Sequence, residues 1–205
     1  MRNLSIPVIT MEKYGFDCPG VDILFDYEKG GYMATRHLIE CGHRRIGCVA
    51  GKQSFHVTMQ RLNGYKKALE ESGISYDPDL VYFGDYTMES GYEAFSYILG
   101  QKVTAIFSMN DEMAFGIYRA ARLYGVSIPE DISIIGFDNV PFADVMQVPL
   151  TTIGVPVIEM GKKLGEKVVD LIDNKEKLKE REEILYTPRL LVRGSTKSIP
   201  PVTVI

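Results

Sequence analysis

The stretch TAIFSMNDEMAFGIYRAARLYGVSIPEDISIIGFDNV, residues 104–140, decides the fold. Apolar runs at 103–109 and 132–137 have the length and content of buried strands. Between them, residues 111–124 carry apolar side chains at helical spacing, and Gly125 ends the pattern. A strand, a helix and a second strand in this order predict two parallel strands joined by a right-handed crossover.

The same alternation continues over the rest of the chain, which predicts an α/β fold built on parallel sheets. A charged stretch at 173–183 is interpreted as a solvated extension of the last helix. Residues 184–196 are interpreted as two short strands, or as one strand interrupted by Pro188. The further strands are expected at 7–10, 21–25, 46–51, 80–84 and 150–154, and the further helices at 28–42, 58–72, 88–99 and 156–173.

The composition argues against several classes of protein. The 205 residues carry a net charge of −4, and no Lys/Arg run exceeds a pair such as Arg44-Arg45, whereas nucleic-acid-binding domains are usually basic. The three cysteines and three histidines have no CxxC or HxxxH spacing, so neither a metal nor a cofactor is expected. No apolar run approaches the length that spans a membrane, so no membrane contact is expected.

Polar and aromatic side chains follow four of the predicted strands at their carboxyl ends. Ligands of open parallel sheets bind outside these ends, which lie along one edge of the sheet. We therefore predict that the side chains meet at one rim. They are Phe55 and Arg61 after the strand 46–51, Tyr86 after 80–84, Asn110 and Asp111 after 103–109, and Asp138 after 132–137.

Each of these residues also has a purely structural interpretation. Asn110 or Asp111 suits the N-cap of the helix that follows. Asp138 suits a turn before Asn-Val-Pro. Arg61 can be a solvated helix residue, and Tyr86 can lie at the edge of the core. Taken singly, most of them fit these roles, and it is the shared edge that favours a ligand site.

The residue types at this rim favour a neutral ligand rich in hydroxyl groups. Carboxylates accept hydrogen bonds from adjacent hydroxyls and an arginine donates to two, and each such charge-assisted bond contributes roughly 1.5–3 kcal/mol. An aromatic side chain covers the apolar face of a ring. A sugar is therefore the first choice of ligand, and a nucleobase such as a purine is the second. No GxSxG, Walker A or HExxH motif occurs, so no catalytic residue and no enzyme activity are expected.

A set of long segments covers nearly the whole chain in order: DYEKGGYMATRHLIECGHRRIGCVAG (26–51), RLNGYKKALEESGI (61–74), GDYTMESGYEA (84–94), the opening stretch (104–140), LTTIGVPVIEMGKKLGE (150–166) and PRLLVRGST (188–196). These segments closely resemble the effector-binding domain of the lactose/galactose-repressor (LacI/GalR) family of bacterial transcription regulators.

The resemblance implies two Rossmann-like lobes with parallel sheets, joined by three chain crossings, as in type I periplasmic binding proteins. It places residues 1–44 plus 156–183 in the N-terminal lobe and residues 45–155 plus 184–205 in the C-terminal lobe. It also implies that the N-terminal lobe is incomplete in this sequence, because Ile6-Pro7 matches a point well inside that lobe.

The resemblance also assigns roles to single residues. Arg61 is expected to clamp the effector, with Asp138 as its partner carboxylate and Tyr86 at the family's aromatic position. Of the Asn-Asp motif, the asparagine is expected to face the ligand. Glu12 stands where the family usually has an aspartate, and Phe55 lies in a loop that varies with specificity. The full set of expected effector residues is Arg61, Asp138, Tyr86, Asn110, Asp111, Phe55 and Glu12.

The function implied by the resemblance is that of an effector-binding and dimerisation domain in a cytoplasmic regulator. A homodimer is expected, with DNA bound only through a headpiece that this sequence lacks. The alternative is a periplasmic sugar-binding component of a transporter, which shares the fold, so fold alone does not decide between them. The closing PRLLVRGST and the pairing of ND with GFDN favour the regulator.

Overall fold

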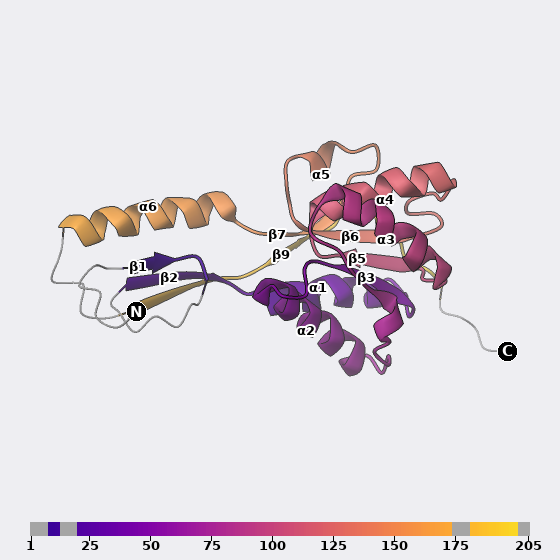
Figure 1. Cartoon of the computed structure of the whole chain (residues 1–205), viewed down its shortest axis with the longest axis horizontal. Helices are drawn as coiled ribbons and strands as arrows, with labels where there is room; N and C mark the ends of the chain where they lie inside the picture. Colours follow the sequence, from indigo (N-terminus) through magenta and orange to yellow (C-terminus); the bar gives the residue numbers. More distant parts are fainter. Residues whose placement is uncertain (1–7, 13–19, 174–180, 201–205) are drawn as a thin grey trace. The chain divides into compact units, whose positions relative to one another are not determined.

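The chain forms two compact units, and Figure 1 labels their helices and strands. Unit 1 comprises Met1–Asp26 and Val155–Pro188, and unit 2 comprises Tyr27–Gly154 and Arg189–Ile205. The chain therefore crosses between the units three times. The structure is a computed structural model that describes residues 8–12, 20–173 and 181–200.

Unit 2 is built on a six-stranded sheet with the order β4-β3-β5-β6-β7-β9. Neighbouring strands are parallel, except that β9 runs antiparallel to β7. Every residue of β3 and of β5 is buried, which explains their continuous apolar runs, because strands covered on both faces need no polar alternation. The strands are β3 (Ile46–Ala50), β4 (Val81–Phe83), β5 (Ala105–Ser108), β6 (Ser133–Asp138), β7 (Thr151–Gly154) and β9 (Arg189–Leu191).

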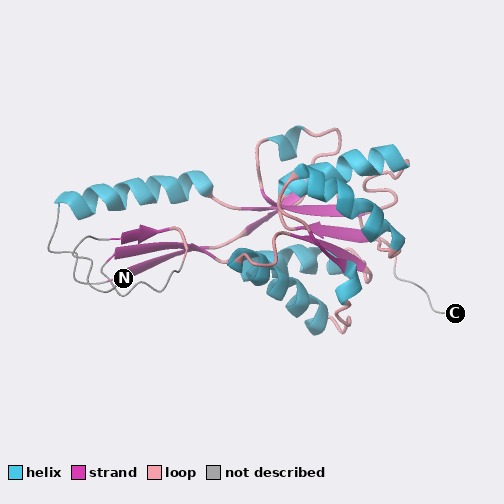
Figure 2. Cartoon of the chain, in the orientation of Figure 1, coloured by secondary structure: helices cyan, strands magenta, loops and turns pink. Residues whose placement is uncertain are grey.

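Helices cover both faces of this sheet (Figure 2). One face carries α1 (Tyr27–Glu40) and α2 (His56–Glu71), and the other carries α3 (Met88–Gly100) and α4 (Asp111–Tyr124). Two short helices were not predicted from the sequence, namely η1 (Pro78–Leu80) and α5 (Phe142–Val145).

The contact between α1 and α2 depends on glycine. A Cβ on Gly31 of α1 would overlap the carbonyl oxygen of Arg61, and a Cβ on Gly64 of α2 would overlap the carbonyl oxygen of Glu28. The two helix backbones therefore approach more closely than any side chain would allow. This approach holds the turn of α2 that carries Arg61 directly against α1.

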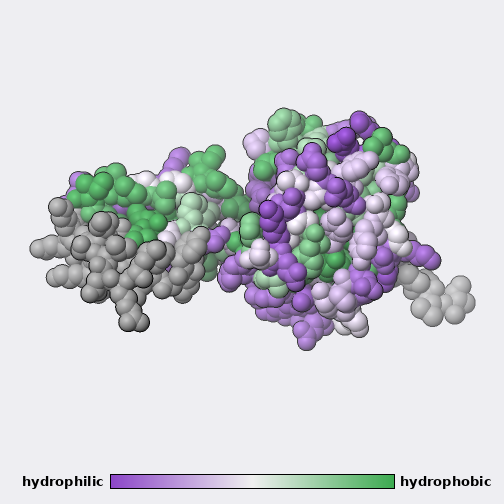
Figure 3. All heavy atoms as spheres, viewed as in Figure 1, coloured by the Kyte–Doolittle hydropathy of each residue, from purple (hydrophilic) through white to green (hydrophobic). Residues whose placement is uncertain are grey.

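Unit 1 contains a three-stranded parallel sheet with the order β1-β2-β8 and one long helix. Its elements are β1 (Val8–Thr10), β2 (Gly20–Phe25), β8 (Arg181–Tyr186) and α6 (Val157–Asp173). Asp22 in β2 is buried, and it accepts hydrogen bonds from Thr10 and from the guanidinium of Arg181. On α6, Ile158 and Ile172 are 75% and 66% exposed, and apolar side chains gather over this helix in Figure 3.

The predicted α/β fold with parallel sheets is confirmed, and two details differ. The helix expected at 28–42 was assigned to the N-terminal lobe, with a boundary at 44, but it belongs to unit 2 because α1 packs on α2 and the six-stranded sheet. The charged extension of the last helix was expected to reach residue 183, yet residues 181–183 begin β8. Residues 174–180 lie outside the described part of the chain.

Candidate functional site

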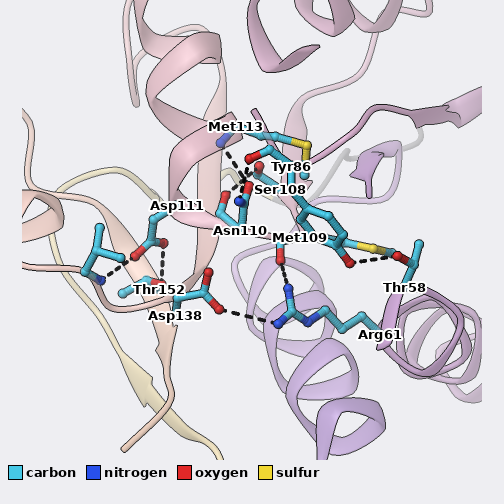
Figure 4. A network of polar contacts seen from close by, with 11 residues as sticks. Thr58, Arg61, Tyr86, Ser108, Met109, Asn110, Asp111, Met113, Asp138 and Thr152 are labelled. Atoms are coloured by element: carbon cyan, nitrogen blue, oxygen red, sulfur yellow. Dashed lines mark hydrogen bonds and ion pairs between the residues drawn. The ribbon is translucent and has the colours of Figure 1, made fainter. Parts of the chain in front are cut away.

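Four loops of unit 2 bring their side chains together at the carboxyl ends of β3, β4, β5 and β6 (Figure 4). Arg61 comes from α2, Tyr86 follows β4, and the Met109 carbonyl and Asn110 follow β5. Asp138 is the last residue of β6. The sequence predicted this convergence from the ends of parallel strands alone.

Arg61 lies at the centre of the cluster, and only 6% of its surface is exposed. Its Nη1 donates a hydrogen bond to the Met109 carbonyl, and its Nη2 lies 3.4 Å from Asp138 Oδ1. Among the described residues, its Nε–H is a buried donor without an acceptor. The interpretation of Arg61 as a solvated helix residue is therefore wrong, because such a residue would not bury an unpaired donor.

Three aromatic rings surround the Arg61 guanidinium. Its central carbon lies 3.9 Å from the centre of the Phe137 ring, 5.0 Å from that of Tyr27 and 5.8 Å from that of Tyr86. Such rings attract a cation through their electron-rich faces and shield it from water. Tyr27 and Phe137 were not predicted as site residues. Alternation along a strand would direct Phe137 and Asp138 to opposite faces of β6, yet both contact Arg61, and Asp138 departs from strand geometry with a φ of +111°.

Asp138 combines an unusual backbone conformation with a perturbed carboxyl group. Its φ angle is +111°, and its side chain is 33% exposed. Burial raises the pKa of Asp138 to about 7, the positive charge of Arg61 opposes this rise, and the negative charge of Asp111 adds to it. A carboxyl group with this pKa changes its charge near neutral pH, so its capacity to accept hydrogen bonds depends on pH.

Tyr86 and Phe55 form an aromatic plate beside Arg61. Their ring centres lie 6.2 Å apart at an interplanar angle of 21°, and the Tyr86 hydroxyl lies 2.7 Å from Thr58 Oγ1. A Cβ on Gly51 would overlap the Tyr86 ring, so this ring rests against the backbone at the end of β3. Phe55 is 47% exposed and occupies the N-cap of α2, where its side chain makes no capping hydrogen bond. Phenylalanine is a poor N-cap residue, so its presence at this position favours a role for the exposed ring rather than a role in capping the helix.

Asn110 has the capping role that was one of its two interpretations. Its Oδ1 accepts a hydrogen bond from the Met113 amide at 2.9 Å, and its Nδ2 donates to the Tyr86 carbonyl at 2.9 Å. Asn110 therefore starts α4 and ties the loop after β5 to the loop after β4. The expected contact with an effector would come in addition to these two bonds.

Asp111 was also expected to contact the effector, but its side chain is fully buried. Its Oδ1 accepts from the Thr152 hydroxyl at 2.7 Å, and its Oδ2 accepts from the Val140 amide at 2.9 Å. Burial raises the pKa of Asp111 to about 6. Both carboxylate oxygens of Asp111 are therefore bound by groups inside the protein, whereas the sequence predicted that this side chain contacts a ligand.

Glu12 lies in unit 1, two residues after β1, and is half-buried. None of the helices in the described part of the chain combines the length and apolarity needed to span a bilayer. Within residues 8–12, 20–173 and 181–200, no group of three or more His, Cys, Asp or Glu side chains is arranged to hold a metal ion.

The chain is similar to known proteins over nearly its whole length. Residues 35–196 match the model of the periplasmic binding protein-like domain. The transcriptional repressor PurR of Photobacterium profundum is 36% identical over 201 residues, which cover 97% of this chain and 59% of the repressor. A LacI-family regulator from Enterococcus faecium with bound ribose superposes with a TM-score of 0.83 at 33% identity, covering 95% of this chain and 71% of that one. The regulator CelR in complex with cellobiose gives a TM-score of 0.82 at 32% identity, over 92% and 58% of the two chains.

The fold, the polar and aromatic cluster at the strand ends and these similarities together define an effector-binding domain of the LacI type. Its relatives are regulators rather than enzymes, in agreement with the prediction from the sequence. The chain belongs to the family of periplasmic binding protein-like domains. It spans 59% of the length of the PurR relative.

Proposed function

We propose that this chain is the effector-binding and dimerisation domain of a bacterial LacI-type transcription regulator. In this proposal the regulator works in the cytoplasm and binds DNA through a headpiece outside this sequence. The observation that carries it is Arg61, a buried arginine at the carboxyl ends of the strands, whose Nε–H has no acceptor among the residues that the structure describes. The similarity to regulators such as PurR favours this function over a transporter component.

The ligand that suits these side chains best is a sugar. Arg61 supplies donors and Asp138 supplies an acceptor for adjacent hydroxyl groups of a ligand. The Arg61 Nη2 and the Asp138 Oδ1 lie 3.4 Å apart. Phe55 and Tyr86 supply an apolar surface for the C–H face of a sugar ring. The solved relatives with bound ribose and with cellobiose are in keeping with this class. We also propose Glu12, two residues after β1, as an effector-binding residue.

A ligand screen tests the sugar proposal. Thermal shift with pentoses, hexoses, disaccharides and purine bases reports any ligand that binds the native state, because such a ligand raises the melting temperature by mass action. Each hit is then titrated by calorimetry against wild type and Arg61→Met. Arg45→Met is the control, because Arg45 directly precedes β3, at the end of the strand opposite the site, and contacts the Gln101 carbonyl and Asp77. We expect a sugar to bind wild type and the control alike. A purine as the sole hit would replace the sugar, and no hit in a chain extended to the full length of its relatives would refute the effector site.

The dimer contact is proposed to lie at a groove of about 880 Å³ on unit 2, between α4 and the loop that follows β6. Phe142 is 70% exposed at this groove, and apolar side chains gather over α5 in Figure 3. Glu112 and Arg122 lie near opposite ends of α4 and both line the groove, so a two-fold axis can pair each with the other in a second copy.

Sedimentation analysis tests this contact. Phe142→Glu is expected to shift a dimer to the monomer, while the control Phe83→Glu, at an exposed phenylalanine of β4, leaves it unchanged. A dimer that persists in Phe142→Glu would show that the dimer contact does not lie at this groove.

A further inference from the structure

The turn after β6 has a backbone that L-residues rarely adopt. Asp138 has a φ of +111° and Asn139 a φ of +60°, so two consecutive non-glycine residues lie at positive φ. Such conformations are unfavourable on their own and persist only where the surroundings hold them. The contacts around this turn therefore show what fixes the direction of the Asp138 side chain.

Asp111 holds the turn from the side of α4. Its Oδ2 accepts the hydrogen bond of the Val140 amide at 2.9 Å, directly after the two residues at positive φ. Its Oδ1 is fixed by the Thr152 hydroxyl at 2.7 Å. A Cβ on Gly136 would overlap this carboxylate, so Asp111 lies against the backbone of β6 itself.

Arg193 holds the same turn from the other side. Its Nη2 donates to Asn139 Oδ1 at 2.7 Å, and its Nη1 donates to the Leu150 carbonyl at 2.7 Å. Its Nε lies 3.2 Å from Asp144 in α5. One guanidinium thus binds both ends and the middle of the loop between β6 and β7. The sequence pointed to this arginine only as part of the closing PRLLVRGST.

We propose that Asp111 and Arg193 are positioning residues, which hold the Asp138–Asn139 turn at positive φ so that the Asp138 carboxylate faces Arg61 and the effector. The part of this inference that concerns the effector rests on the proposed function. The part that concerns the turn does not, because it depends on contacts inside unit 2. The two parts therefore need separate measurements.

Amide hydrogen exchange at Val140 measures the turn without any ligand. In Asp111→Ala this amide is expected to exchange at least about tenfold faster, because it loses its acceptor, while Ile134, the second residue of β6, keeps its rate. If Asp111→Ala does not fold, Asp111→Asn retains an uncharged acceptor and a smaller increase of about threefold is expected. The control is Asp131→Asn, since Asp131 accepts the Ser127 amide at 2.8 Å in a remote turn. An unchanged Val140 rate in both Asp111 variants would overturn the role of Asp111.

A glycine rescue tests Arg193. Arg193→Met is expected to raise Val140 exchange at least about fivefold, and the same change in an Asn139→Gly background less than about twofold, because glycine adopts positive φ without help. Equal increases in both backgrounds would show that Arg193 does not act through this turn.

Calorimetry with D-ribose then tests the link to the effector. Arg193→Met and Asp111→Asn are expected to bind D-ribose at least about tenfold more weakly than wild type and Asp131→Asn. Unchanged affinity together with faster Val140 exchange would confine both residues to the stability of the loop and overturn their positioning role. Absence of D-ribose binding in wild type would count against ribose as the effector, and the exchange rates would still decide the turn.

Discussion

Replacing Asp138 by asparagine is expected to remove a specific pH dependence of stability. The folded state raises the pKa of this carboxyl from 3.8 to about 7, mainly through burial. Between these two pH values the folded chain binds more protons than the unfolded chain, so the contribution of Asp138 to stability is greatest below pH 4 and is lost as the pH rises to about 7. Above pH 7 the contribution is constant, because the carboxyl group is ionised in both states.

The magnitude follows from the shift in pKa. A shift from 3.8 to about 7 is about 3 units, or about 4 kcal/mol at roughly 1.4 kcal/mol per unit. One third of the Asp138 side chain is exposed, so solvent screens part of this energy, and we expect a total change of less than about 4 kcal/mol.

The measurement is urea unfolding of wild type and Asp138→Asn, followed by tyrosine circular dichroism, at pH values from 4.5 to 8.5. Two other effects are present in both proteins. Burial lowers the pKa of His37 and of His43, which makes stability rise with pH up to about 6.5. Burial raises the pKa of Asp111 to about 6. Stability therefore also falls with rising pH through Asp111, but this fall ends near pH 6.

The difference between wild type and variant is therefore the informative quantity, and the interval from pH 6 to pH 7 is the most specific to Asp138. In this interval the advantage of wild type over Asp138→Asn should still decrease, and above pH 7.5 it should be constant. The control Asp131→Asn should follow the wild-type curve. A difference that is flat from pH 5 to pH 8 would show that Asp138 is ionised throughout, and would refute the account of its environment.

Three further substitutions test other parts of the account. Arg61→Met should weaken binding of a sugar effector by about 1.5–3 kcal/mol in calorimetry. Its melting temperature should change little, because the loss of the Met109 bond is offset by removal of a buried donor that has no acceptor in the described part of the chain. A large fall in melting temperature with intact affinity would contradict this. Asn110→Ala should lower the free energy of unfolding by about 0.5–2 kcal/mol through loss of the cap of α4, whereas Ser96→Ala, on the exposed side of α3, should lower it by less than about 0.5 kcal/mol. Gly31→Ala should destabilise unit 2 by more than about 2 kcal/mol in urea unfolding, because its Cβ would overlap the Arg61 carbonyl, while Gly73→Ala, which meets only the strain of a positive φ, should cost about 1 kcal/mol.

Sequence reasoning located most of the fold and the rim of the site, because both depend on local patterns. Continuous apolar runs identified β3, β5 and β6, and the residues directly after them converge as parallel strands require. Its errors concern long-range packing. No packing role was predicted for Gly31, whereas it permits the contact between α1 and α2 that places α1 in unit 2.

The roles of Asn110 and Asp111 show a second kind of limit. Both are adjacent polar residues at the end of a strand, and the sequence does not reveal which oxygen finds a partner inside the protein. The Asp111 carboxylate is engaged by Thr152, which is 41 residues away in sequence. Tyr27 reaches Arg61 from a distant element in the same way. Such partners are set by the three-dimensional arrangement, so no local pattern predicts them.

The register of the six-stranded sheet has a mechanical consequence. Asp138 of β6 is paired with Gly154 of β7, which is paired with Arg189 of β9. Gly154 is the last residue of unit 2 before the second crossing, and Arg189 is the first after the third. The carboxylate at the strand end and two of the three connections therefore share one row of the sheet. We therefore expect a displacement of the Asp138 backbone to act first on its neighbours in this row, which are the residues at which the second connection begins and the third ends.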